Sequence, residues 1–473
     1  MQELRLDMPT GIRLSHVWKH LVFALLAGFA LRLFFVWQFP REWADSFVYE
    51  ELARNLIDHR VYGVFLDGKL TPLDIRVPGY PVFLAGVYLL FGRSPLATML
   101  TQAVIDLATC ALTALLASLI APAASRKRVF VAALWLAVMC PFTASYTAVV
   151  VTEILATFLT AAALVVLVKG YQNQDRGPGW RGRMGTFATW LWGGLLVGLA
   201  TLVRPESPLL LVAAGLLLVV RWWRPSDWMK LLGSSTLLAV GLAAALLPWA
   251  MRNWHTFHKV EFLTPRYYAM PGDYVPRGFY AWTNTWLVRM RDVYQVFWKL
   301  GDDPIPIENV PNSAFDSPEE RKRVAMLLDQ YNPITTLTPE ADEAFGELAR
   351  ERTARHPLRT YLWIPLRRSA SIWLTPRTEN FLQEDAPVPS STTVVMALVN
   401  VFYLGLALVG ARRWRCLPGV WLLVAFAVVR TAFFVHVETP EPRYVLECFP
   451  AILALAALVW PRGFAPTRNS APD

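Results

Sequence analysis

Charge is scarce in this sequence. Asp, Glu, Lys and Arg together make up 17% of its 473 residues, whereas a soluble domain carries about a quarter. The hydrophobic residues, 55% of the chain, gather in several segments of about 18 or more nearly uncharged residues, the length that crosses a bilayer. The composition therefore argues against a soluble protein and predicts a polytopic protein surrounded by membrane lipids.

Cysteine is also scarce. The chain has four cysteines, and none of them belongs to a Cys-x-x-Cys pair. Three lie in or beside apolar segments, where cysteine behaves as a small apolar residue. This pattern predicts neither a disulfide framework nor a cysteine-based metal site. The sequence also has no internal repeat, although many transporters are built from inverted repeats.

The net charge is +9. In a membrane protein a basic balance reflects Lys and Arg in cytoplasmic loops, so we expect no nucleic-acid partner. The predicted fold class is all-α, with about ten transmembrane helices, outer-side interfacial helices and one large outer loop domain. The expected spans are 17–39, 95–119, 129–146, 148–168, 186–203, 207–222, 230–250, 391–410, 418–436 and 445–460.

Lys and Arg concentrate in alternate connections between these spans. The positive-inside rule places such connections on the cytoplasmic side. They are the N-terminus, 120–128, 169–185, 221–230, 411–417 and the C-terminus. We therefore expect a multi-pass protein of the bacterial inner membrane with both chain ends in the cytoplasm. The first apolar span contains Arg32 and is followed by no small-residue cleavage pattern, which predicts a retained helix rather than a removed signal peptide.

This topology divides the chain into an N-terminal transmembrane module (1–250), a periplasmic or luminal loop domain (251–390) and C-terminal transmembrane helices (391–473). The first outer loop, 40–94, is the expected catalytic loop. Within it, the apolar spacing over 47–59 predicts an interfacial helix with Glu50 and Glu51 on its wet face.

Two further helices are expected in the outer parts of the chain. The segment 80–91 is too short to span and fits a second interfacial helix, or one packed into the bundle. In the loop domain, Ser317-Pro318 and Thr338-Pro339 are typical helix starts, with an N-cap residue followed by proline. We expect the second of these helices to stop before Pro357.

Acidic residues near the outer span ends are candidates for chemistry. A lone acid such as Asp45, just after the first span, is usually a solvated charge. Here Asp74 and Arg76 return to the same depth, and Glu153 lies near the outer end of a span. An ionisable group within a span indicates function, or pairing with a nearby arginine. Asp106, nearer mid-span, is interpreted as structural.

Arginines from distant parts of the chain reach the same outer depth. Arg204, Arg252 and Arg443 all map to outer span ends. The guanidinium fork matches phosphate oxygens, so three such residues at one depth indicate an anion site. The alternative, for each arginine taken alone, is that its long side chain only carries the charge to the membrane–water interface. The role of Arg430, within a span, stays open.

The order of these features resembles a known family. An acid follows the opening span, and an amphipathic helix with Tyr49, Ala53 and Leu56 comes next. The later motifs are Arg76-Val77-Pro78-Gly79-Tyr80-Pro81, Thr152-Glu153, Val203-Arg204-Pro205, Pro248-Trp249-Ala250-Met251-Arg252-Asn253 and Pro442-Arg443-Tyr444. This set resembles the GT-C superfamily of integral-membrane glycosyltransferases, including the protein O-mannosyltransferase and lipid A aminoarabinose transferase groups. The resemblance covers most of the chain except 251–390.

The resemblance implies an inverting transfer of a sugar from a polyprenyl-phosphate donor to a glycan, lipid or protein acceptor. It implies catalytic roles for Asp45, as general base, and Glu153. Asp74 is a candidate ligand for a divalent metal ion. The residues implied to bind substrate or phosphate are Arg76, Tyr80, Arg204, Arg252 and Arg443. The chain has Ile75-Arg76-Val77-Pro78 where the aminoarabinose transferases have Glu-Lys-Pro-Pro, which leaves the metal and the sugar open.

Two other classes of function stay open. A transporter or flippase for a lipid-linked or anionic substrate would fit the number of spans, although transporters usually place charges near the midplane. A non-catalytic membrane scaffold would fit the Trp-rich stretch 251–300, which could bind a partner protein.

Overall fold

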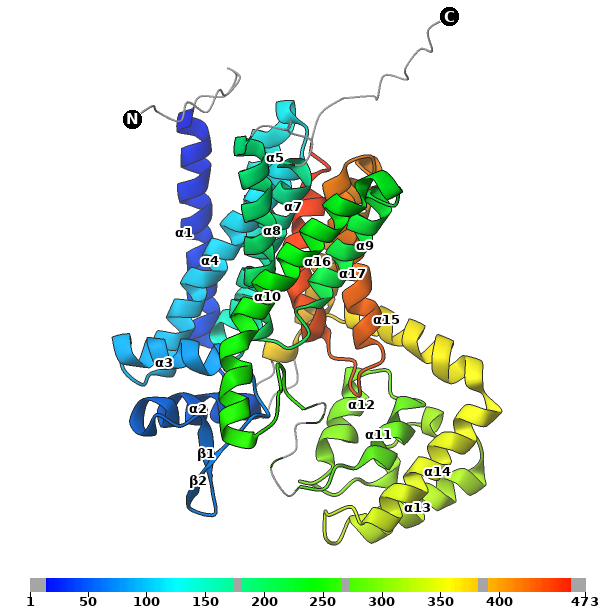
Figure 1. Ribbon diagram of the computed structural model, residues 1–473. Helices are drawn as coiled ribbons and strands as arrows, with labels where there is room; N and C mark the ends of the chain where they lie inside the picture. The colour runs from blue at the N-terminus through cyan, green and yellow to red at the C-terminus, as the bar shows by residue number, and fades with distance from the viewer. Residues whose placement is uncertain are drawn as a thin grey trace, which may run out of the picture.

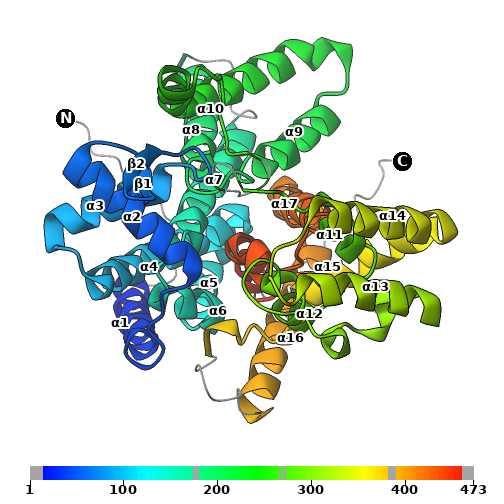
Figure 2. The same cartoon turned by 90° about the horizontal axis from the view of Figure 1, so that it is seen from below.

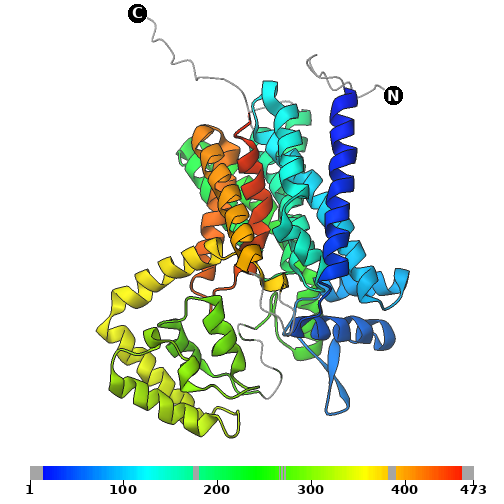
Figure 3. The same cartoon turned by 180° about the vertical axis from the view of Figure 1, so that it is seen from behind.

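A bundle of long helices forms the body of the protein (Figures 1 and 3). The computed structural model describes residues 14–173, 180–265, 267, 270, 273–381 and 390–460. The bundle helices are α1 (Leu14–Gln38), α4 (Pro95–Ile120), α5 (Arg126–Val138), α7 (Glu153–Asn173), α8 (Trp180–Thr201), α9 (Leu209–Arg221), α10 (Trp228–Phe257), α16 (Ser390–Arg413), α17 (Pro418–Phe434) and α18 (Phe449–Ala457).

Several of these helices are long and apolar enough to cross a membrane. By length and composition, the described residues contain five: Val17–Gln38, Pro95–Ile120, Glu153–Gln172, Pro225–Phe257 and Ser390–Arg413. The bent pair Ala123–Val138 and Pro141–Ala148 adds a sixth if it forms one span. The chain is therefore a multi-pass membrane protein. The count of about ten spans stays a prediction.

The expected alternation of the chain through the bundle agrees with the arrangement of the helices. Figure 1 shows that α9 and α16 end on the side of the bundle away from α2 (Ala44–His59), α3 (Gly79–Phe91) and the outer helices of the loop domain. The basic connections 221–230 and 411–417 follow these two helices, so they share one end. The side of the membrane that this end faces stays a prediction, and residues 1–13 and 461–473 lie outside the described part of the chain.

The first outer loop holds the expected helices and an unexpected hairpin. Both α2 and α3 lie across the end of the bundle, as the apolar spacing predicts (Figure 1). Strands β1 (Gly63–Leu66) and β2 (Lys69–Pro72) form an antiparallel pair, which the all-α expectation missed. Their turn has positive φ at Asp67 (49°) and Gly68 (75°). An Asp-Gly pair favours this two-residue turn, so the signal was present in the sequence.

The prediction that Glu50 lies on the wet face of α2 is wrong. Glu50 is 4% exposed, and its carboxylate accepts a hydrogen bond from Arg54 at 2.6 Å. Glu51 holds the hairpin, because it accepts a hydrogen bond from the Phe65 amide at 2.7 Å. Periodicity locates a face of a helix, but it does not show that a neighbouring helix such as α3 covers part of that face.

The expected continuous helix over 129–146 is interrupted. α5 ends at Val138 and the short α6 (Pro141–Ser145) follows it, with a bend of 42° between the two parts. Pro141 has no amide hydrogen and cannot continue the helix. The 3-10 turn η2 (Tyr146–Ala148) comes next, and Val149 forms a parallel bridge with Arg41. This path brings the start of α7 to the first outer loop.

The last expected span, 445–460, also begins irregularly, with the 3-10 segment η9 (Pro442–Cys448) before α18.

Deep in the bundle, Arg32 donates to the Asp106 carboxylate at 2.9 Å, and both side chains are almost fully buried. This pair agrees with the structural role expected for Asp106.

The first outer loop is fixed to the bundle at two points. The Arg252 guanidinium donates to the carbonyl oxygens of Tyr62 and Leu73, each at 2.8 Å. The Gly79 amide donates to the Leu202 carbonyl oxygen at 2.6 Å. A Cβ atom at position 79 would lie 2.4 Å from that same oxygen, so only glycine permits this approach. The loop therefore keeps a fixed position beside the turn that follows α8.

The loop domain has a core of its own, built on Phe279, Trp282 and Phe345. Its helices are α11 (Arg277–Asn284), α12 (Met290–Gln295), α13 (Pro318–Tyr331) and α14 (Pro339–Arg355). The two predicted helix starts are confirmed, with Ser317 and Thr338 accepting backbone hydrogen bonds as N-caps. α14 ends at Arg355, as expected before Pro357. The π-helical turn η7 (Arg359–Trp363) and α15 (Ile364–Leu374) return the chain to the bundle.

Cys416 offers a direct test of the orientation. It is the one exposed cysteine in the described part of the chain, within the basic connection 411–417, while Cys110, Cys140 and Cys448 are buried. In spheroplasts, we expect a membrane-impermeant maleimide to leave Cys416 unmodified until the membrane is permeabilised. Met326→Cys on α13, at a position 58% exposed, should react without permeabilisation. Labelling of Cys416 in intact spheroplasts, with Met326→Cys protected, would show the opposite orientation.

Candidate active site

A cleft of about 1750 Å³ lies where the bundle meets the loop domain. Figure 2 shows α2 and α3 on one side of the bundle end and α11, α13 and α14 on the other. The lining comes from four regions: the first outer loop, the segment 151–153 at the start of α7, the turn 203–206 after α8, and the segment 432–444 that ends in η9, together with loop-domain residues. Predicted site residues that line the cleft are Asp45, Arg76, Glu153, Arg204 and Arg443.

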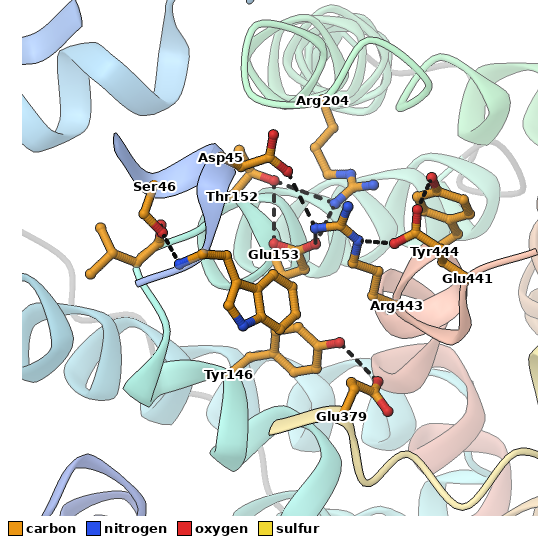
Figure 4. A network of polar contacts seen from close by, with 12 residues as sticks. Asp45, Ser46, Tyr146, Thr152, Glu153, Arg204, Glu379, Glu441, Arg443 and Tyr444 are labelled. Atoms are coloured by element: carbon orange, nitrogen blue, oxygen red, sulfur yellow. Dashed lines mark hydrogen bonds and ion pairs between the residues drawn. The ribbon is translucent and has the colours of Figure 1, made fainter. Parts of the chain in front are cut away.

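Asp45 lies in the first turn of α2, where local contacts fix its position. The Trp43 amide donates to the Ser46 hydroxyl at 2.9 Å, which is one half of a capping box. The same hydroxyl donates to the Val150 carbonyl oxygen at 2.8 Å. These bonds hold the start of α2 against the segment that precedes α7 (Figure 4). A carboxylate at this end of a helix is also favoured by the helix dipole.

Two guanidinium groups face the Asp45 carboxylate. Arg76 donates to Oδ1 at 2.7 Å, and Arg443 lies 3.5 Å from Oδ2. Burial by itself would raise the pKa of Asp45, but the charges of Arg443 and Arg76 outweigh it, so the pKa lies below its ordinary value. The Asp45 side chain is 30% exposed. It is therefore an ionised carboxylate at neutral pH that a ligand in the cleft can reach.

Glu153 is almost fully buried, with 1% of its side chain exposed. Its Oε1 accepts a hydrogen bond from Arg204 at 2.8 Å, and Thr152 donates to its Oε2 at 3.4 Å. Arg443 lies 3.8 Å from the same Oε1. Glu153 therefore pairs with a nearby arginine, which is one of the two roles that the sequence left open for it (Figure 4).

Besides Glu447, which lies 3.2 Å from Arg204, two further acids hold the arginines, and sequence reasoning missed all three. Glu206 accepts from Arg204 at 2.6 Å, and Glu441 accepts from Arg443 at 2.5 Å. Each acid lies two residues from its arginine, in Arg204-Pro205-Glu206 and Glu441-Pro442-Arg443. The sequence shows these pairs as one Arg-Pro-Glu motif and one Glu-Pro-Arg motif, in each of which a single proline separates the arginine from the acid. The result is a cluster in which each arginine has carboxylate partners on more than one chain segment.

Three of the predicted site residues lie outside the cleft lining. Tyr80 is fully buried and donates to Gln102 Oε1 at 2.8 Å. Arg252 holds the backbone of the first outer loop. Asp74 lies beside Glu261, where burial and then the Asp74 charge raise the pKa of the Glu261 carboxyl. None of the three is in the described lining of the cleft, so a direct role for them in ligand binding stays a prediction.

The residues around Asp45 do not fit a divalent cation. Both Asp45 oxygens face guanidinium groups, and these positive charges repel a metal cation. Across the described ranges, no group of three or more His, Cys, Asp or Glu side chains is placed to hold a metal ion. Asp74, the candidate metal ligand, has Glu261 beside it but lies away from the cleft.

Comparison with known proteins gives structural matches only. Neither a protein-family model nor a curated protein sequence matches the chain. The oligosaccharyltransferase of Archaeoglobus fulgidus, crystallised with a tethered acceptor peptide, matches with a TM-score of 0.53 and 15% identity, over 94% of this chain and 49% of its own. AglB from the same organism, in complex with an inhibitory peptide and a dolichol-phosphate, gives 0.51 and 14%, over 94% and 50%.

A bacterial structure also matches over most of its length. ArnT from Cupriavidus metallidurans, bound to undecaprenyl phosphate, gives a TM-score of 0.40 at 14% identity, over 94% of this chain and 77% of its own. The present chain spans about half the length of the archaeal oligosaccharyltransferases. At identities of 14–15%, these matches establish likeness of fold alone. The chain therefore shares the fold of these archaeal oligosaccharyltransferase structures.

Proposed function

We propose that the protein is a glycosyltransferase that moves a sugar from a polyprenyl-phosphate donor to an acceptor hydroxyl on the outer side of the membrane. The observation that carries the proposal is the ionised Asp45 carboxylate in a large cleft, between the guanidiniums of Arg76 and Arg443. A neighbour with the same fold, AglB, is known in complex with a dolichol-phosphate, which supports a lipid-phosphate donor.

The proposed reaction is a single inverting displacement. The acceptor oxygen attacks the anomeric carbon from the side opposite the phosphate, and its proton passes to Asp45 as general base. The bond between the anomeric carbon and the phosphate oxygen breaks, and polyprenyl phosphate leaves with the electron pair. Fixed guanidiniums stabilise the negative charge as it develops on that oxygen. We assign this role to Arg76 and Arg443, which line the same cleft as Asp45.

The two guanidiniums also link binding of the donor to the pKa of Asp45. In the structure they pair with Asp45, so a donor phosphate must compete with that carboxylate for them. When they turn to the phosphate, the Asp45 oxygens lose their donors and the pKa of Asp45 rises. The carboxylate then becomes a better proton acceptor at the moment when the donor is in place. We therefore expect the donor to bind before the acceptor reacts.

Glu153 takes a positioning role in this proposal. It is buried and bonded to Arg204, with Thr152 on its other oxygen. Arg204 also pairs with Glu206 at 2.6 Å. The two acids hold the Arg204 guanidinium on the wall of the cleft, where it can meet a phosphate oxygen without a large loss of side-chain entropy.

Asp45→Asn tests the assigned base. The amide cannot take the proton, so transfer of radiolabelled sugar from a polyprenyl-phosphate sugar to candidate acceptors should fall by about 10²–10⁴-fold. Asp58→Asn is the matched control, because Asp58 is 39% exposed near the end of α2 and pairs with Arg93 away from the cleft. Thermal unfolding of each purified variant shows whether it is folded. Equal transfer by wild type and Asp45→Asn would refute the mechanism.

The pH dependence of transfer tests whether the neighbouring guanidiniums lower the pKa of Asp45. The pKa of Asp45 is lowered, so the acid limb of the kcat/KM profile should lie below the ordinary Asp value of about 3.9. Arg443→Gln removes the charge that lowers this pKa most, and the limb should then move to higher pH. Arg93→Gln, outside the cleft, should leave the limb in place. An unchanged limb in Arg443→Gln would show that Asp45 does not set it.

A further inference from the structure

The loop domain gives the cleft an aromatic wall. We use this name for Tyr280 on α11, Tyr294 on α12, and Phe297 and Trp298 in the 3-10 turn η4 (Phe297–Lys299). All of them line the cleft that contains Asp45. The bundle side contributes aromatic rings as well, and several of these contact the arginines. Trp43, for example, lies 5.3 Å from the Arg443 guanidinium.

The rings of the aromatic wall are arranged in two pairs. Tyr280 and Phe297 stack with centroids 5.1 Å apart. Tyr294 and Trp298 meet edge to face at 4.7 Å, and each is 40% exposed. The core of the loop domain lies behind them, where Phe279 is fully buried. Open aromatic surface in a cleft, beside a complete core, is available to bind a ligand.

Acids line both sides of the cleft, but the positive charges in the described lining lie on one side. Every arginine in the described lining comes from the bundle side: Arg41, Arg76, Arg204 and Arg443. Among the described lining residues between 263 and 337, the loop domain contributes Asp273 and Asp302 and neither Lys nor Arg. The arginines that can pair with a phosphate therefore lie on the bundle side, among acids, and the loop-domain side offers a phosphate acids alone. The aromatic wall is therefore suited to the substrate that carries no phosphate.

Tyr294 lines the same cleft as Asp45 and Arg443. Burial raises the pKa of Tyr294 to about 12, and the charges of Glu379 and Glu441 add to the effect. Its hydroxyl is therefore protonated at neutral pH and can donate a hydrogen bond. Glu441 is the partner of Arg443, which in turn faces Asp45. A ligand on the aromatic wall would reach the base without leaving the cleft.

We propose that the aromatic wall binds the acceptor and that the acceptor is a neutral glycan, an inference that rests on the proposed transferase function. A sugar ring presents a C–H face, which packs on an aromatic ring, and a rim of hydroxyls, which donate to carboxylates such as Asp273 and Asp302. A prenyl chain offers no partner for these acids. Peptide binding by strand addition needs an open strand edge, and the hairpin β1–β2 is not part of the described lining.

Binding of defined oligosaccharides to the full-length protein in nanodiscs tests this proposal. The probes are neutral oligosaccharides of glucose, galactose, mannose and N-acetylglucosamine, tested free and attached to a lipid anchor. Phosphorylated forms of the same glycans and a set of unstructured peptides complete the panel. We expect neutral glycans to bind, and Trp298→Ala and Tyr294→Ala to weaken them by about tenfold or more. Binding of either the free or the anchored form supports the proposal and identifies the source of the glycan.

Matched variants separate ring contact from loss of folding. Trp298→Phe keeps an aromatic face and should retain most of the binding. Tyr361→Ala removes a ring that is 70% exposed and lies outside the cleft lining, so it should have no effect. Equal glycan binding by wild type and Trp298→Ala would overturn the proposal, as would a wild type that binds no neutral glycan. Peptide binding that depends on Trp298, without glycan binding, would assign the wall to a peptide acceptor instead.

Undecaprenyl phosphate, titrated into the same samples, distinguishes this inference from the function on which it rests. The Trp298→Ala and Tyr294→Ala variants should bind this lipid as wild type does, whereas Arg76→Gln should weaken it. If wild type binds neutral glycans through Trp298 but shows no affinity for undecaprenyl phosphate, the donor assignment fails and the glycan site stands. If Trp298→Ala weakens the lipid and spares the glycans, the wall holds the prenyl chain and this proposal fails.

Discussion

The Asp45 carboxylate is held between two guanidiniums that come from distant parts of the chain. Arg76 follows the hairpin of the first outer loop, and Arg443 lies in η9 near the other end of the sequence. Arg76 makes a charge-assisted hydrogen bond to Asp45, an interaction that contributes about 1.5–3 kcal/mol. The charges of Arg443 and Arg76 together outweigh the burial of Asp45. The cleft can therefore keep a reactive anion at its centre, and the surrounding acids keep the arginines in place.

Irregular backbone at the outer end of the bundle makes this meeting possible. Pro141 ends a bundle helix early and lets the segment through Val149 cross to Arg41. The close contact of Gly79 with Leu202 fixes the first outer loop beside the turn that carries Arg204. Non-helical backbone at membrane depth is tolerated where it is buried in protein or lines a cavity. The chain places such backbone around the candidate site.

The sequence predicts how deep a residue lies along the membrane normal better than it predicts where the residue lies in the plane of the membrane. Hydropathy and loop charge place Asp45, Arg76, Arg204 and Arg443 at one depth, and the structure brings these four to one cleft. They also place Arg252 at that depth, but it turns toward the first outer loop instead. Periodic patterns of apolar and charged residues carry no information about which helices become neighbours.

Local signals were sufficient for some features and insufficient for others. N-cap residues followed by proline located α13 and α14, because capping is decided within a few residues. The burial of Glu50 depends on what packs against α2, and the separation of Asp74 from the cleft depends on the path of the hairpin. The aromatic wall depends on how the loop domain packs against the bundle. That packing is set by long-range contacts such as Arg368 with the Leu287 and Val437 carbonyl oxygens.

If Asp45 competes with the donor phosphate for Arg76 and Arg443, loss of its charge should help binding while it stops catalysis. The most direct measurement is the affinity of purified wild type and Asp45→Asn for undecaprenyl phosphate in nanodiscs. We expect the Asn variant to bind several-fold more tightly, because a like charge and a rival partner are both removed. Equal or weaker binding by Asp45→Asn would contradict the competition between base and phosphate at the centre of the cleft.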